Sequence, residues 1–396
     1  MPAQRTRSEV PFNRHMLRWA REWRRRTVDE AASKVRTSTD KITEWEEGTS
    51  KPTVRQARLL AEFYERPFLE FFLPEPPEVQ EAPKLVDYRL YAGKESPSQP
   101  DVEPILRWAQ EVRLNALDLY DLLGEEPSRF PPSLYATIDE DPERVAAKVR
   151  EASEFTLDSQ TSLRANQRYE IVRILRQAVE RLGVLVLRNT ELADFGARGV
   201  CLFDEMVPVI VFGKEAPTAQ AFTIAHELGH VVLQDGSISG PLSASSDPRR
   251  VADTERWCNR FSAAYLMPRE AINEVWPLPN QPLDEVTDDQ LSQVANHFSV
   301  SPHAALIRLV ELGYVRAEFY WNKKRAEFVA AENESYRGFG RAAYYGTRYR
   351  SAVGDTYTGL VIEALNNGLV THHSASEFMG IKNPKHLSDI VENFRP

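Results

Sequence analysis

The sequence predicts an α+β protein that is predominantly helical, with a small β-sheet. Helices are predicted because apolar residues recur at helical spacing through most of the chain, with Ser, Thr, Asp, Gly and Pro marking their ends. The sheet is predicted because three short runs rich in Val, Leu and Ile, at 184–188, 199–203 and 208–212, interrupt that pattern. A length of 396 residues with 42% hydrophobic residues is enough for two or three separate cores.

The composition limits where such a protein would work. The N-terminus is polar and rich in Arg with no apolar run behind it, so no secretory signal is expected. No apolar stretch is long enough to span a bilayer, so no membrane partner is expected. The two cysteines, Cys201 and Cys258, are too few for a disulfide framework. We therefore expect a cytoplasmic protein, since a reducing compartment favours free thiols.

The charge is uneven along the chain. Residues 1–66 contain 15 Lys and Arg against 10 Asp and Glu, whereas the whole chain has a formal net charge of −9. Any contact with nucleic acid is therefore expected in this basic head, which we take as a domain of residues 1–73.

Five short helices are predicted in the head, at 13–23, 28–35, 39–46, 54–64 and 67–73. Thr27 can cap the second helix and Thr39 the third, which Gly48 ends. A tight turn between the second and third helices is typical of a helix-turn-helix. The run I-T-E-W-E-E-G, followed by K-P-T, resembles the W-E-x-G…P-T signature of Xre/Cro-type domains.

Double-stranded DNA is the first candidate partner of the head. The side chains expected to contact phosphates or base edges are Arg18, Arg21, Ser38, Thr39, Lys41 and Thr43. The third helix also carries four acidic residues, which repel phosphate. The alternative is a head that keeps this fold but serves as a protein-binding or dimerisation module, so a homodimer is a second candidate.

Residues 74–104 hold seven of the 26 prolines, which predicts a linker. Residues 105–316 are taken as one domain with helical flanks, with helices expected at 105–123, 142–155 and 163–181 before the strands. Residues 317–396 are taken as a small helical C-terminal segment. There, Arg and aromatic residues alternate at 336–350, and we expect a loop rather than a surface on which bases stack.

The strongest chemical motif is H-E-L-G-H at 226–230, inside an apolar stretch dense enough for a buried helix. At 3.6 residues per turn, His226 and His230 share one face, so both imidazoles can bind one Zn²⁺. Glu227 can hold and deprotonate a water on that ion, and H-E-x-x-H is the zincin signature. The alternative is a core helix that carries these residues by chance, but packing gives no reason to bury a Glu between two His.

A catalytic zinc usually has three protein ligands, so one more is expected. The next strong helical stretch, 251–268, offers Glu255 as the best candidate and Asp253 as the second. Asn259 lies one turn after Glu255 and can hydrogen-bond to a ligand. Cys258 is a donor that zinc accepts, but we expect it to be a small buried core residue.

H-E-L-G-H followed by E-R-W-C-N-R-F-S-A-A-Y-L-M-P resembles the ImmA/IrrE metallopeptidase family, whose second motif reads approximately E-x-x-A/C-N-x-F-A-x-x-L-L-M-P. Ser262 and Tyr265 are mild departures from that pattern. The resemblance implies that the metal ligands are His226, His230 and Glu255, a gluzincin-like set, and that the catalytic glutamate is Glu227. It also implies narrow, regulated proteolysis, typically of a repressor.

The sequence therefore predicts a regulatory zinc-dependent endopeptidase that cleaves a specific protein partner, such as a repressor, or itself, and is coupled to a helix-turn-helix module. An edge strand beside the metal helix is expected to hold an extended peptide. The stretch 234–248 is expected to be a flap, and Tyr265 or His297 to stabilise the oxyanion. The alternative is a DNA-binding transcriptional regulator, or a toxin–antitoxin or phage-defence component, whose zinc site is structural or sensory.

Overall fold

The structure is a computed structural model. It describes residues 12–75, 99–163, 167, 169–192, 197–235, 248–276, 281–328 and 345–394, except for 25, 65, 67 and 384. The chain divides into two compact units: residues 1–82 with 98–104, and residues 83–97 with 105–396. Each unit is described by itself. Most of the predicted linker, most of the predicted flap and residues 336–344 lie outside the described residues.

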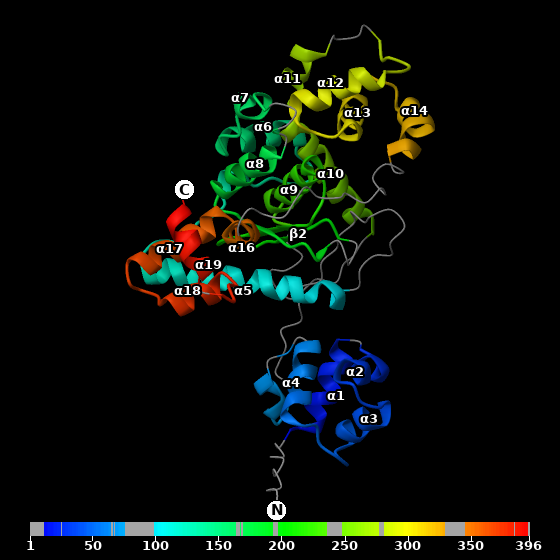
Figure 1. Ribbon diagram of the computed structural model, residues 1–396. Coiled ribbons are helices and arrows are strands. Elements are labelled where there is room, and N and C mark those ends of the chain that lie inside the picture. The colour runs from blue at the N-terminus through cyan, green and yellow to red at the C-terminus, as the bar shows by residue number, and fades with distance from the viewer. Residues whose placement is uncertain are drawn as a thin grey trace, which may run out of the picture. The chain divides into compact units, whose positions relative to one another are not determined.

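The first unit is a small helical domain built from four α-helices and a 3₁₀ turn (Figure 1). Their bounds are α1 (Arg14–Trp23), α2 (Val28–Val35), α3 (Thr39–Glu47), α4 (Val54–Phe63) and η1 (Phe68–Phe72). The inward faces form one core that includes Leu17, Ala31 and Trp45. The five predicted elements are thus present within one or two residues at each end.

Capping residues explain these boundaries. Thr27 and Thr53 each form a capping box, in which the side chain accepts a backbone N–H and a Glu or Gln three residues on returns a bond. Ser38, rather than the expected Thr39, caps α3, and its hydroxyl accepts from the backbone N–H of Lys41. Gly48 ends α3 with a φ of 80°, a left-handed conformation that glycine adopts without strain.

The second unit contains the sheet, whose three strands are β1 (Leu185–Arg188), β2 (Gly199–Leu202) and β3 (Val209–Phe212). The order is β1-β3-β2, so β3 is central, with β1 parallel and β2 antiparallel to it. All strand residues except Arg188 are buried, because helices cover the sheet. The predicted fold class, a predominantly helical α+β protein with a small sheet, is confirmed.

Helices before the sheet are α5 (Gln99–Leu123), α6 (Pro142–Ala152), α7 (Leu157–Thr161) and α8 (Glu170–Glu180), with a 3₁₀ turn η2 (Pro132–Leu134). All three helices predicted here differ in their bounds, and α6 ends three residues before the predicted residue 155. Helix α5 starts six residues earlier than Ile105 and contains Pro104. The predicted helix 163–181 is shorter, and a separate short helix, α7, precedes it because Thr156 caps that turn independently.

After the sheet come α9 (Pro217–Val232), α10 (Pro248–Leu266), α11 (Arg269–Val275), α12 (Asp288–Phe298) and α13 (Pro302–Glu311). Helix α9 contacts β2 and β3 on one side and α8 and α10 on the others, so it lies at the centre of the unit (Figure 1). A single hydrophobic cluster joins the strands to these helices. Among the described residues, no helix combines the length and apolar character needed to cross a membrane.

The C-terminal part is helical: α14 (Ala317–Phe319), the π-helical turn η5 (Tyr320–Lys324), α16 (Tyr345–Val353), α17 (Asp355–Asn366), α18 (His372–Phe378) and α19 (Lys385–Asn393). The loop expected over 345–350 is wrong, since these residues form α16. Helix α16 packs beside β1, where the buried guanidinium of Arg176 donates to the carbonyls of Val186 on β1 and Ser351 on α16. That tertiary packing favours the helix over a loop.

Candidate metal centre

Helix α9 is apolar on nearly every side, because it is enclosed by the sheet and by neighbouring helices. Twelve of its sixteen residues are buried, including His226, Glu227 and His230. Pro217 stands in the first turn, where its fixed φ suits a helix start and no N–H is missed. Burial of two imidazoles and a carboxylate on such a helix requires partners for their polar atoms.

Helix α10 supplies those partners because it approaches α9 closely. A Cβ placed on Gly229 would lie 3.2 Å from the Sγ and 3.3 Å from the Cα of Cys258, so a side chain there would require Cys258 to shift by a few tenths of an ångström. On α10 itself the rings of Trp257, Phe261 and Tyr265 stack in series at 5.3 Å and 5.9 Å between centroids. This buried aromatic row fixes the rotation of α10, which brings Glu255 to the histidines.

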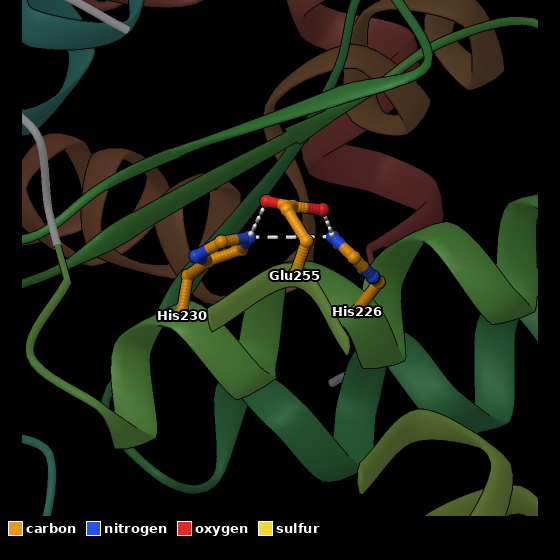
Figure 2. Close-up of side chains that lie close together, drawn as sticks. All are labelled: His226, His230 and Glu255. Carbon is orange, nitrogen blue, oxygen red and sulfur yellow. Dashed lines mark hydrogen bonds and ion pairs between the residues drawn. The ribbon is translucent and has the colours of Figure 1, made fainter. Parts of the chain in front are cut away.

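His226, His230 and Glu255 converge in one place (Figure 2). The two Nε2 atoms are 3.2 Å apart, and each lies 3.2 Å from a different carboxylate oxygen of Glu255. Tetrahedral zinc with bonds of about 2.0–2.1 Å separates its ligand atoms by about 3.3 Å. The three side chains therefore present two nitrogens and a carboxylate with the separations and donor types that a zinc ion requires.

The other ring nitrogen of His226 has its own partner. Its Nδ1 lies 3.1 Å from the amide oxygen Oδ1 of Asn259, one turn after Glu255 on α10. If Nδ1 donates to that oxygen, the proton is held there and the lone pair on Nε2 faces Glu255. The structure thus brings Asn259 to the place that the sequence predicted.

Glu227 lies where the sheet meets α9. A Cβ placed on Gly199 of β2 would lie 2.8 Å from Oε1 of Glu227 and 2.6 Å from Cγ2 of Thr223. The hydroxyl of Thr223 donates to Glu215 over 2.9 Å, and Arg198 pairs with the same carboxylate at 3.6 Å. Glycine at 199 therefore lets β2 approach the carboxylate of Glu227 as no other residue could.

Electrostatics in the metal-free arrangement keep the carboxylate ionised. Burial disfavours the charged form of Glu255, but hydrogen bonds from His226 and His230 outweigh it and lower its pKa to about 2. Burial also opposes protonation of His230, yet Cys258, Asp235 and Glu255 together raise its pKa well above the ordinary value. These shifts favour a positive charge beside the Glu255 carboxylate, and a divalent cation would supply one.

Asp253, Tyr265 and His297 fall outside this cluster, whereas the thiol of Cys258 borders it beside His230. The side chain of Asp253 is half exposed and pairs with Arg256 at 2.7 Å, so it is a surface residue. Cys258 is fully buried, as expected of a core residue. Tyr265 is also fully buried, and its hydroxyl bonds to Ser153 at 2.8 Å, which commits that hydroxyl to the core. His297 packs edge-on against Phe298 on α12.

In the first unit, Arg21 and Arg18 both face Glu46. Arg21 makes a two-pronged bond to the buried carboxylate, at 2.7 Å and 2.8 Å, and its side chain is only 12% exposed. Arg18 lies 3.6 Å from Glu46 and stays half exposed. Arg21 thus holds α1 against α3, a structural role in place of the expected phosphate contact.

The expected base-reading side chains lie along the start of α3, and most have local partners. Ser38 caps the helix, Lys41 pairs with Glu44, and the hydroxyl of Thr43 donates to the carbonyl of Thr39. Ser38, Lys41 and Thr43 are exposed and Thr39 is partly exposed, so they remain on the surface of α3.

Sequence reasoning missed two residues of the site. Gly199 gives no signal in the sequence beyond a glycine at a strand start, which is usually taken as a turn. Asp235, whose carboxylate lies 3.7 Å from Nδ1 of His230, follows the end of the apolar stretch. A carboxylate five residues after a candidate ligand is the kind of signal that could have found it.

With this geometry in view, comparison with known proteins places the second unit. Residues 179–310 match the family model of the IrrE N-terminal-like domain, a peptidase family. The match includes α9 and α10 and hence every residue of the cluster. This part of the chain is therefore similar to metallopeptidase domains, and that similarity implies a metal ion.

One curated relative is the radiation response metalloprotease IrrE of Deinococcus radiodurans. The two chains are 34% identical over 112 residues, which cover 28% of this chain and 33% of the relative. The alignment thus spans about a third of that relative's length, so the likeness concerns this domain.

Proposed function

We propose that this chain is a regulatory zinc-dependent endopeptidase, with His226, His230 and Glu255 as the metal ligands and Glu227 as the catalytic base. The observation that carries the proposal is the convergence of two Nε2 atoms and one carboxylate at 3.2 Å, beside a second buried carboxylate. The match to a peptidase family over 179–310 supports it. We place the activity in the cytoplasm, where the two free cysteines would stay reduced.

The residues of the site suggest how a peptide bond would be hydrolysed. When bound, zinc would polarise the scissile carbonyl and acidify the attacking water. Glu227 would take the proton of that water and pass it to the leaving amine. Its burial against Gly199 would restrict the carboxylate to few orientations.

Strand β2 is the proposed platform for the substrate. It is an outer strand of the sheet, so one of its edges faces away from β3, and its first residue contacts Glu227. An extended peptide added to this edge would use backbone hydrogen bonds and would lie beside the catalytic base. The substrate class would then be an extended segment of a protein partner such as a repressor, or of this chain itself.

Replacing Glu227 by Gln tests the proposal. We expect the wild type with Zn²⁺ to cut itself or a restricted set of peptides from a proteome-derived library, analysed by mass spectrometry. Glu227→Gln should keep one equivalent of zinc and lose cleavage, because an amide cannot accept the proton. Glu270→Gln, an exposed position on α11, is the control. Equal cleavage by wild type and Glu227→Gln, or none by the wild type, would contradict the proposal.

For the first unit we propose a helix-turn-helix module that binds double-stranded DNA through Arg18 and the exposed residues of α3. The short turn at 36–38, with Arg36 left-handed at a φ of 54°, supports this. Gel shifts of the full chain on duplex DNA should weaken steeply with salt and with Arg18→Ala. Arg256→Ala, which removes an exposed Arg from α10, should leave them unchanged. Shifts insensitive to salt and to Arg18 would favour the alternative, a protein-binding module.

A further inference from the structure

The two candidate histidine ligands have different partners on their outer nitrogens. His226 Nδ1 meets the neutral amide of Asn259 on α10, whereas His230 Nδ1 meets the carboxylate of Asp235 just beyond α9. We propose that Asp235 is a positioning residue of the metal centre, which holds His230 through Nδ1 so that Nε2 faces the ion. This inference rests on the metal site of the proposed function.

The backbone places Asp235 on its target. After α9 the N–H of Gln234 donates to the carbonyl of Val231, and the N–H of Asp235 donates to the carbonyl of His230, both at 3.0 Å. This pair of bonds is a Schellman motif, which turns the chain back over the last helical turn. Asp235 is thus hydrogen-bonded to the same residue whose ring its carboxylate faces.

The motif is kept at a cost. Its turning residue, Gln234, has a φ of 53°, a left-handed conformation that is unfavourable for a non-glycine residue. Helix capping alone does not explain an acidic residue there, because the helix dipole opposes a carboxylate at a helix C-terminus. A cationic or metal-bound imidazole beside Asp235 offsets the unfavourable interaction of its carboxylate with the helix dipole.

The contact has a defined chemical consequence. A carboxylate near Nδ1 favours the tautomer that carries its proton on Nδ1, which leaves the Nε2 lone pair for a cation. It also makes the imidazole a stronger donor than an amide partner does, so His230 would bind the ion more tightly than His226. The Asp235 side chain is half exposed and lies outside the core, so its removal should affect the metal far more than the fold.

The test measures Zn²⁺ affinity of the full chain by competition with a chromophoric chelator. We expect Asp235→Ala to weaken affinity about 10–100-fold, the usual effect of losing such a partner, and Asp235→Asn to weaken it less. Asp253→Ala is a matched control, because that side chain is equally exposed and pairs with Arg256 instead. Gln234→Gly should retain full affinity, since glycine adopts the left-handed turn freely.

Thermal unfolding of the metal-free variants distinguishes positioning from a structural role. Asp235→Ala should unfold at the wild-type temperature without metal and gain less stabilisation when Zn²⁺ is added. The inference is overturned if Asp235→Ala binds zinc within twofold of wild type, if Asp253→Ala loses as much, or if the wild type binds none. Tight zinc binding that depends on Asp235, in a protein that cuts no peptide, would leave the inference standing and reject only the proteolytic function.

Discussion

Two buried carboxylates, one in each unit, show how similar burial can serve stability or chemistry. Glu46 is 7% exposed and Glu255 is 9% exposed, and both receive bonds from a helix other than their own. Glu46 meets Arg21, whose pKa the hydrogen bond with Glu46 raises further, so the guanidinium stays charged. Glu255 meets two imidazoles, which can give up a proton. A site that binds a metal cation needs partners that can lose a proton, as these imidazoles can.

The largest expected effects come from removing each carboxylate. Glu46→Ala would leave the Arg21 guanidinium buried without its partner, and we expect it to cost about 3 kcal/mol. Hydrogen exchange of peptides from residues 12–75 would report the loss. Glu255→Ala should destabilise the metal-free protein less than Glu46→Ala does, because the two imidazoles can release a proton and become neutral, whereas the Arg21 guanidinium cannot.

Metal analysis completes this comparison. The Glu255→Ala variant should bind no stoichiometric zinc, whereas Glu46→Ala should bind as much as the wild type. At 100 times the dissociation constant, zinc should stabilise the wild type by about 2.7 kcal/mol and leave Glu255→Ala unchanged. If Glu255→Ala destabilises the metal-free protein as much as Glu46→Ala does, the contrast drawn between these two carboxylates is wrong.

A smaller effect is expected from pH. The metal-free site holds a proton because the pKa of His230 is raised well above its ordinary value, and zinc needs the neutral ring. Zinc affinity should therefore rise with pH, by up to about tenfold per unit, while His230 is protonated, and level off above its pKa. Calorimetry in buffers of different ionisation enthalpy would detect the released proton. An affinity independent of pH between 6 and 8 would contradict this.

Local patterns predicted the parts of the molecule that depend on neighbours in sequence. The helix pattern fixed the shared face of His226 and His230, and the helix ends followed from caps such as Thr27. In the structure, Glu255 and Asn259 on the neighbouring helix α10 lie beside these histidines, as the sequence predicts.

Contacts between residues far apart in the sequence could not be predicted from local patterns. Arg21 was assigned to phosphate because its own helix is basic, whereas the residue that binds it lies 25 positions away on α3. The alternation of Arg with aromatic residues at 345–350 predicts a loop, whereas these residues form α16, which packs beside β1. Asp235 escaped notice because its role depends on a turn set by a strained glutamine.

The two glycine contacts of α9 have a consequence for recognising related proteins. Strand β2 meets this helix at Gly199 and α10 meets it at Gly229, and an added Cβ would be crowded at both junctions, more severely at Gly199. A chain could therefore carry every chemical group of the cluster and still assemble it badly, if bulky residues stood at these two positions. Small residues at these two positions are therefore as informative about whether the cluster can assemble as the histidines themselves.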